Sequence, residues 1–171
     1  MKALCLALLL PVLAAVAAEA PASFKVGAFT FKRPEKWQHI EPSSPMRKAQ
    51  LRVPAEKGEG ADVIFFHFGP GNGGGTQANV DRWLMQFKDV KGKKVSDTKI
   101  GQHKVTYVQT EGTYSGGMPG AAPQDLKGYA LLGAIVESDE GSVFIKMTGP
   151  APVVQGGDGE FRKMVEGALK K

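Results

Sequence analysis

The chain has almost no cysteine. Its single cysteine, Cys5, lies in the N-terminal segment 1–18, MKALCLALLLPVLAAVAA. This segment has the pattern of a secretory signal peptide: a lysine near the start, an apolar stretch, and small residues at the end where a signal peptidase cleaves. The mature chain, residues 19–171, therefore has no cysteine, which excludes disulfides, thiol nucleophiles and cysteine metal sites.

The sequence also lacks a long hydrophobic run. The apolar stretch of the leader is short for a membrane span, which needs about 20 residues, and an uncleaved anchor is the less favoured alternative. Cleavage after Ala18 is preferred to cleavage after Ala20, because the latter leaves Pro21 next to the cut. We therefore expect a periplasmic or secreted protein that does not span a membrane after cleavage, with residues 19–171 forming a single monomeric domain.

Positive charge is in small excess over negative charge. Loss of the leader removes one lysine, so the formal net charge falls from +5 to +4, with 21 Lys plus Arg against 17 Asp plus Glu. The densest positive run is KDVKGKKVSDTK, residues 88–99. A basic patch outside the cytoplasm can meet anionic lipid, polysaccharide or an acidic partner. The favoured interpretation is the solvated end of a helix and its loop. Since no aromatics interleave with the lysines, nucleic acid is not an expected partner.

Recognisable patterns for catalysis and metal binding are missing. The three histidines, His39, His67 and His103, include no pair with metal-ligand spacing. No serine has the G-x-S-x-G setting of a hydrolase nucleophile, and no carboxylate pair stands out for acid–base chemistry. We expect a protein that is not an enzyme and that uses no cofactor and no metal.

Apolar periodicity predicts strands and two helices. The expected strands are a hairpin at 23–33, then 46–54, 61–68, 95–100, 103–114, 128–137 and 142–149. The first helix is expected from Thr76 as N-cap to Gly92, and the second from a cap at Asp158 or Gly159 to the end. Segment 34–45 is expected to be a proline-rich connection. Strands that run together predict an α+β fold, an antiparallel sheet of about six to seven strands flanked by helices.

The glycine-rich loop 69–76 contains the spacing G-x-G-x-x-G. It also fits a P-loop, except that Gly75 replaces the lysine that reaches the phosphates. Pro70 removes one backbone donor, and no parallel βαβ unit follows, so nucleotide binding is disfavoured. The preferred interpretation is structural: a strand turns into a helix through residues that adopt positive φ. Binding of a small anion at the start of the helix is the alternative.

Polar residues next to this loop complete a candidate binding surface, to which loop 115–125 is a possible addition. Asn79, Arg82 and Gln86 follow the spacing i, i+3, i+7 and share one helix face. A structural role, with Asn79 and Arg82 holding loop carbonyls, is placed ahead of a ligand-facing role. The candidate binding residues are Gly71, Gly73, Gly74, Thr76, Asn79 and Arg82.

Several stretches together resemble a group of secreted bacterial proteins with the fold of the PsbP-like and DcrB-like domains. The most specific pattern is GPGxGGxxxxNxxRW, carried here by Gly69, Pro70, Gly71, Gly73, Gly74, Asn79, Arg82 and Trp83. The resemblance implies an α/β/α sandwich around an antiparallel sheet.

Function follows less directly from this resemblance. The superfold includes an extrinsic subunit of photosystem II and a Ran-binding nuclear import factor, both of them binding or assembly modules. This favours a non-catalytic binding or accessory domain that acts through a protein or envelope partner. The alternative is a small-molecule, anion or metal-ion binding protein that uses loop 69–76 and the adjacent helix face.

Overall fold

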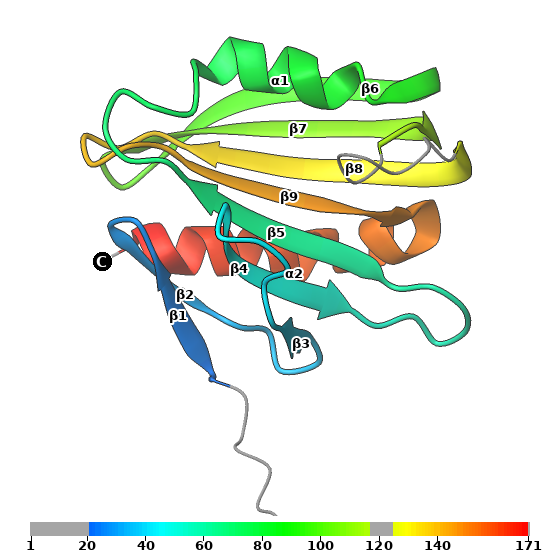
Figure 1. The fold of residues 1–171 in the computed structure, drawn as a ribbon, viewed down its shortest axis with the longest axis horizontal. Helices are drawn as coiled ribbons and strands as arrows, with labels where there is room; N and C mark the ends of the chain where they lie inside the picture. The colour runs from blue at the N-terminus through cyan, green and yellow to red at the C-terminus, as the bar shows by residue number, and fades with distance from the viewer. Residues whose placement is uncertain (1–20, 117–124, 171) are drawn as a thin grey trace, which may run out of the picture.

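The computed structural model describes residues 21–116 and 125–170, so the expected signal peptide and most of loop 115–125 lie outside the described residues. Within these residues the chain forms two helices and nine strands, arranged as in Figure 1. The strands are β1 (Ser23–Val26), β2 (Phe29–Lys32), β3 (Gln38–Ile40), β4 (Arg47–Val53), β5 (Ala61–His67), β6 (Phe87–Ile100), β7 (His103–Tyr114), β8 (Leu126–Val136) and β9 (Val143–Pro150). The helices are α1 (Thr76–Leu84) and α2 (Ala151–Leu169).

Seven strands form one antiparallel sheet in the order β3-β4-β5-β9-β8-β7-β6. Strands β1 and β2 form a separate two-stranded antiparallel hairpin. This arrangement confirms the predicted α+β fold with an antiparallel sheet. The most apolar strands, β8 and β9, lie near the centre, where both faces of a sheet are covered.

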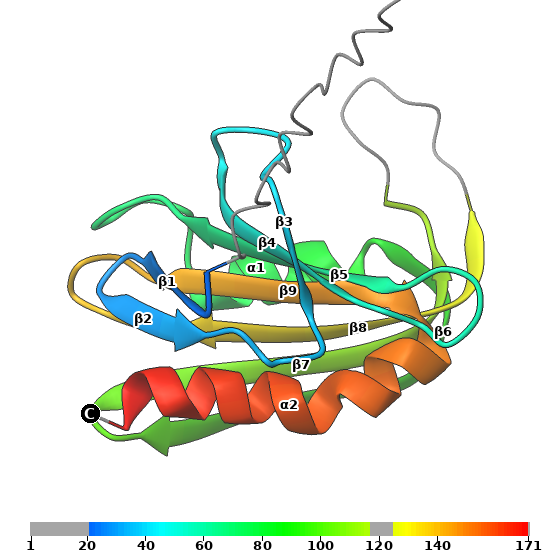
Figure 2. The ribbon, with the colours of Figure 1, turned by 90° about the horizontal axis from the view of Figure 1, so that it is seen from below.

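The two helices lie on opposite faces of the sheet. Figure 2 shows α2 and the β1–β2 hairpin on one side and α1 on the other. The buried clusters of apolar residues support this arrangement. One cluster joins α2 and the hairpin to one face of the sheet, and a second cluster joins α1 to the other face. The predicted α/β/α sandwich is therefore confirmed.

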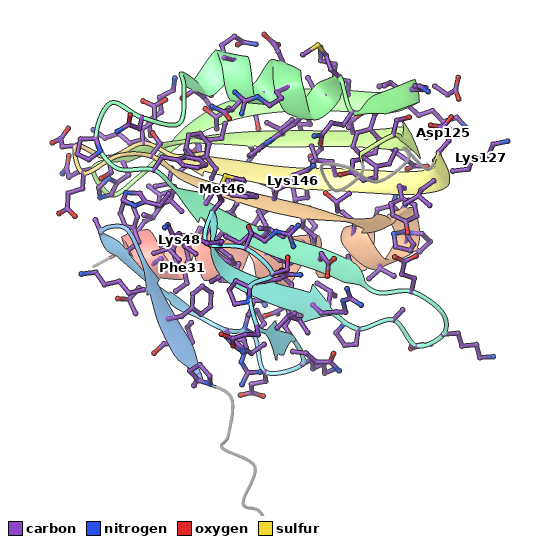
Figure 3. All side chains as sticks on the ribbon, in the orientation of Figure 1. Phe31, Met46, Lys48, Asp125, Lys127 and Lys146 are labelled. Carbon is purple, nitrogen blue, oxygen red and sulfur yellow. The ribbon has the colours of Figure 1, made fainter. Side chains whose placement is uncertain are left out.

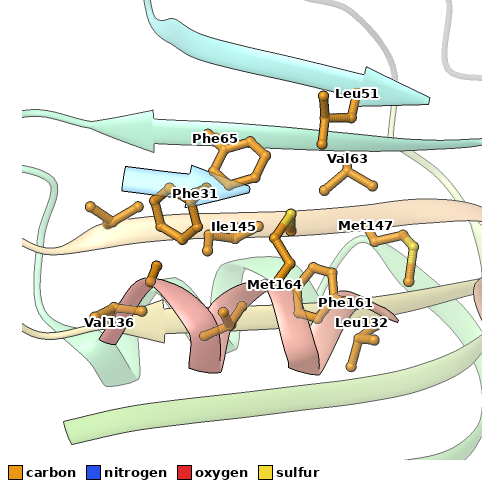
Figure 4. Packing of buried hydrophobic residues seen from close by; sticks show 14 of the residues in the cluster. Phe31, Leu51, Val63, Phe65, Leu132, Val136, Ile145, Met147, Phe161 and Met164 are labelled. Atoms are coloured by element: carbon orange, nitrogen blue, oxygen red, sulfur yellow. The ribbon is translucent and has the colours of Figure 1, made fainter. Parts of the chain in front are cut away.

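The larger core lies between the sheet, α2 and the hairpin (Figure 4). Phe65 of β5 meets the rings of Phe31 and Phe24 edge-on, with centroids 5.1 and 5.0 Å apart. Phe161 and Met164 of α2 are buried against them. Each fully buried side chain of this size contributes about 1.5–3 kcal/mol relative to exposure.

The smaller core lies beneath α1. Val80 and Trp83 are buried against β7, β8 and β9, so Trp83 is a core residue as expected. Gly133 of β8 makes room for the indole, because a Cβ there would lie only 2.3 Å from the Trp83 ring. A larger residue at this position would displace α1 from the sheet.

Two helix boundaries were predicted wrongly. Helix α2 begins at Ala151, with Pro152 in its first turn, so Asp158 and Gly159 lie inside the helix rather than capping it. Ala151, Val154, Gly157 and Phe161 continue the buried stripe toward the N-terminus, and three glycines in this stretch hide that periodicity in the sequence. Burial against the sheet outweighs their poor helix propensity.

The first helix is also shorter than predicted. It ends at Leu84, and Gly92 lies at φ +66° within β6 instead of closing the helix. The predicted proline-rich connection contains the short strand β3, which pairs with β4. Pairing with the next strand along the chain decided the structure of both segments, β3 with β4 and β6 with β7, and the propensity of the segment alone does not encode such pairing.

Candidate functional site

The glycine-rich loop bends through residues with positive φ. Gly69, Gly71, Gly73 and Gly74 have φ values of +82°, +70°, +89° and +78°. Side-chain-bearing residues rarely adopt this region. At Gly73 a Cβ would also lie 2.8 Å from the ring of Phe68. The predicted structural role of the glycines is confirmed.

Asn79 and Arg82 stabilise this loop from within. Asn79 is 3% exposed, and its Nδ2 donates to the carbonyls of Gly73 (2.9 Å) and Gly75 (3.0 Å). Arg82 Nη1 donates to Asn79 Oδ1 at 2.9 Å. The interpretation that side chains hold loop carbonyls is therefore confirmed for Asn79, whereas Arg82 bonds to the Asn79 side chain and acts on the loop through it.

Thr76 is not the N-cap. Gly75 occupies that position with extended dihedral angles, φ −69° and ψ 159°, and no side chain caps the helix. Thr76 is already helical, and its hydroxyl donates to Glu137 Oε1 at 2.9 Å. A cap side chain must precede the first helical residue to reach the free N–H groups, and Thr76 comes one position too late.

The structure brings the six predicted binding residues together at the start of α1, whereas Ser115, the first residue of loop 115–125, lies near the opposite end of that helix. Gln86, beyond the far end of α1, accepts the backbone N–H of Ser115 at 2.7 Å. The nine residues of α1 separate these two ends, a distance of about 13 Å. Binding at the glycine loop remains a prediction.

The basic run 88–99 lies on an edge strand, not at the end of a helix as predicted. β6 pairs with β7 only, and every residue from Lys88 to Lys99 is exposed. Two register shifts, between Lys88 and Lys91 and between Lys91 and Lys94, interrupt the ladder. The strand also exposes two apolar side chains, Val90 and Val95.

Most lysines of β6 have no acidic partner within the described part of the chain. We call Lys91, Lys93, Lys94 and Lys99 the lysine edge. None of them forms a salt bridge with any residue in the ranges 21–116 and 125–170. The acidic Asp97 on the same strand is already occupied, since Thr106 and Lys104 donate hydrogen bonds that lower the pKa of its carboxyl. The edge thus presents net positive charge together with unpaired backbone groups.

A second cationic feature lies on the α1 face of the sheet. Lys146 of β9 donates hydrogen bonds to Gln86 Oε1 and to the Tyr114 hydroxyl (3.3 Å), and its Nζ lies 5.0 Å from the Tyr114 ring centroid. Burial lowers the pKa of Lys146 to about 8. Sequence reasoning missed this residue, although one lysine in the apolar run VFIKM was a usable signal.

A groove lies between the hairpin, segment 33–37 and α2, and has a volume of about 1160 Å³. Its lining includes the apolar residues Trp37, Val53, Val153 and Met164, and Trp37 is a core residue as expected. Lysines and glutamates both line it, Lys32, Lys36 and Lys163 beside Glu35, Glu56 and Glu160. This mixture gives no selection for ligand charge.

The described part of the chain shows no group of three or more His, Cys, Asp or Glu residues that could hold a metal ion. Within the same residues, no helix has the length and apolar character needed to cross a membrane. The histidines are dispersed: His67 Nε2 contacts the Glu140 carbonyl, and His103 Nδ1 contacts the Glu137 carbonyl.

Two solved structures are similar to the chain. One is a protein of unknown function from Pseudomonas aeruginosa, PA94, described as a candidate regulator; it is 13% identical, with a TM-score of 0.50 over 84% of this chain and 92% of that one. The other is the cyanobacterial PsbP (CyanoP) of Synechocystis sp. PCC 6803, 11% identical, with a TM-score of 0.51 over 90% of this chain and 95% of that one. No protein-family model matches the chain, and neither does any curated protein sequence. The chain therefore has a PsbP-like fold, as the sequence resemblance implied.

Proposed function

We propose that the protein is an extracytoplasmic, non-catalytic accessory domain that binds an acidic, extended segment of a protein partner along strand β6. The lysine edge carries this proposal. The pattern of a signal peptide in residues 1–18 supports the location. The likeness to CyanoP and to the PA94 protein supports an accessory or regulatory role by analogy of fold.

An edge strand offers backbone N–H and C=O groups that a further strand can pair with. β6 has 14 residues, which is long for an edge, and β7 covers one side of it only. The four cations of the lysine edge repel a second copy of the same strand. They attract a strand that carries carboxylates, because opposite charges on neighbouring strands stabilise pairing.

Exposed apolar side chains add a second element of recognition. Val95 is 42% exposed and lies where β6 pairs in continuous register with β7. An acidic strand with alternating apolar residues can place its carboxylates near the lysines and its apolar side chains on Val95. The mixed composition of β6 therefore favours an acidic amphipathic segment over a purely anionic surface.

The test uses a short fluorescent peptide of alternating glutamate and valine and measures anisotropy with the mature chain. Neutralising three lysines of the edge, Lys91→Gln, Lys93→Gln and Lys94→Gln together, is expected to weaken binding about tenfold, since each exposed pair contributes only part of a kcal/mol. Neutralising Lys32, Lys36 and Lys163 at the groove removes the same charge elsewhere and is the matched control. Equal weakening by both triple variants would contradict a site on β6.

Strand addition has its own control. The same peptide, methylated on alternate backbone nitrogens, keeps its charge but cannot form a ladder. We expect it to bind much more weakly, and we expect amide signals of residues 94–100 to shift with the unmodified peptide only. Equal binding of the two peptides would show that charge acts without strand pairing. Export is tested separately, by fusing residues 1–20 to a reporter enzyme that is active only outside the cytoplasm.

A further inference from the structure

The α1 face of the sheet contains a positive charge that has no acidic partner. Lys146 lies in the central strand β9, between Ile64 of β5 and Gly133 of β8 in the register. Its Nζ is hydrogen-bonded to neutral groups, the Gln86 amide oxygen and the Tyr114 hydroxyl. It forms no salt bridge with any residue the structure describes. Buried charges are normally paired, so this ammonium lacks its usual complement.

A second cation lies on the same face. Arg47 of β4 directs Nη1 to Gln50 Oε1 at 2.9 Å, and Gln50 lies across Ile64 from Lys146 in the same row of the sheet. The charge of Arg47 also acts on the Tyr114 hydroxyl, where it opposes the rise in pKa that burial causes. Arg47 too forms no salt bridge with the described residues.

Aromatic side chains border the two cations. Arg47 pairs with Phe66 in the register, and Phe66 pairs with Phe144 of β9. Phe68 stacks on Phe66 with ring centroids 6.3 Å apart and is 42% exposed. Diagonal neighbours across a sheet lie within reach of aromatic side chains, so this aromatic strip adjoins the row that contains Lys146.

Exposed side chains border this region. Figure 3 labels Lys146 and Met46 in the central part of the view, below α1. The segment between β3 and β4, which contains Met46, rises from the sheet on the α1 side (Figure 2). Met46 is 59% exposed and precedes Arg47 directly.

We propose that this face is a binding site for a small organic carboxylate with an aromatic or aliphatic body, held by Lys146 and Arg47 and packed on Phe66 and Phe68. The Arg47 guanidinium is planar, and its nitrogens other than Nη1 remain to form a fork on the carboxylate. Lys146 supplies a point charge on the other side. The exposed ring of Phe68 supplies apolar surface that inorganic anions cannot use.

The experiment follows amide and lysine side-chain NMR signals of the mature chain during titration with benzoate. Benzamide has the same shape without the charge, and inorganic phosphate has charge without the apolar body. We expect saturable shifts of Lys146 and Phe66 with benzoate, and weaker or absent shifts with the other two. Equal response to benzamide or to phosphate would overturn the assignment of a carboxylate ligand.

Variants locate the site. Lys146→Met keeps the aliphatic stem and is expected to weaken benzoate binding about tenfold, as loss of a hydrogen bond to a charged group predicts. Arg47→Gln is expected to weaken it as well. Lys48→Met removes an exposed charge from the same strand as Arg47 and is the matched control, with binding unchanged. Unchanged binding in a folded Lys146→Met protein would overturn the proposal, as would equal loss in the control.

Discussion

The two faces of the sheet are built differently. The α2 face is covered by a helix of 19 residues and by the β1–β2 hairpin, and its core contains 26 buried apolar residues. The α1 face is covered by a helix of nine residues, with eight buried apolar residues in its core. Polar groups occupy part of the α1 face: Lys146, the buried Gln50, and the buried hydroxyls of Thr110 and Thr148, which have no hydrogen-bond partner among the described residues.

This difference separates stability from binding. A continuous apolar face contributes most of the favourable free energy of folding. A face that contains a desolvated ammonium and buried polar side chains contributes less to stability, since these groups lose hydration on folding. The α2 face therefore contributes most of the apolar stabilisation, and the α1 face and the β6 edge carry the groups on which the two proposed binding sites rest.

The largest expected effect is on the α2 face. Phe161→Ala removes a fully buried ring from the centre of that core, and we expect the free energy of unfolding to fall by about 3–5 kcal/mol. Phe68→Ala on the α1 face removes a ring that is 42% exposed, and we expect a loss below about 1 kcal/mol. Urea denaturation of both variants checks this, and similar losses would remove the distinction between the two faces.

The next effect is the pH dependence that Lys146 gives to the α1 face. The folded protein releases the Lys146 proton near pH 8, because burial lowers its pKa to about 8, whereas the unfolded chain holds it to about pH 10.4. Between these values the unfolded state binds more protons, so the free energy of unfolding rises with pH. The rise in the free energy of unfolding begins near pH 8 and is complete above about pH 10.4. Relative to the value below pH 8, it amounts to roughly 3 kcal/mol.

Lys146→Met is expected to abolish this contribution. Between about pH 7.5 and 10.5, the free energy of unfolding of the wild type should therefore rise relative to that of the variant. Tyr114 accepts a hydrogen bond from this ammonium, and the charge of Arg47 acts on the Tyr114 hydroxyl; both residues remain in the variant. Lys48→Met, at an exposed position, should show no such shift. A pH-independent difference for Lys146→Met would show that the ammonium is well solvated.

The smallest effect is in the glycine loop beside α1. Gly74 has φ +78° and Gly75 has φ −69°, so serine is strained at the first position and suits the second, which is the N-cap. We expect Gly74→Ser to cost about 1–2 kcal/mol and Gly75→Ser to be neutral or stabilising. Thermal melting checks this pair, with about 2–4 °C expected for each kcal/mol. Equal melting temperatures would refute the role of positive φ.

Local sequence patterns predicted some elements of this fold and missed others. The continuous apolar run of residues 61–68 predicted a strand near the middle of the sheet, and β5 lies there, because both faces of such a strand are covered. The glycines of loop 69–76 identified a turn, because φ is a local property. The start of α2 and the end of α1 were missed, since packing against the sheet and pairing with β7 decided them.

The sequence by itself determined the α+β class, the positive-φ loop, the absence of cysteine chemistry in residues 19–171, and the composition of the lysine edge. All of these depend on local sterics or on residue type. Only the tertiary structure decided that residues 88–99 form an exposed edge, and that Lys146, Gln86 and Tyr114 meet. Those contacts join residues far apart in the chain, and the register between distant strands that brings them together is set by the packing of the whole domain.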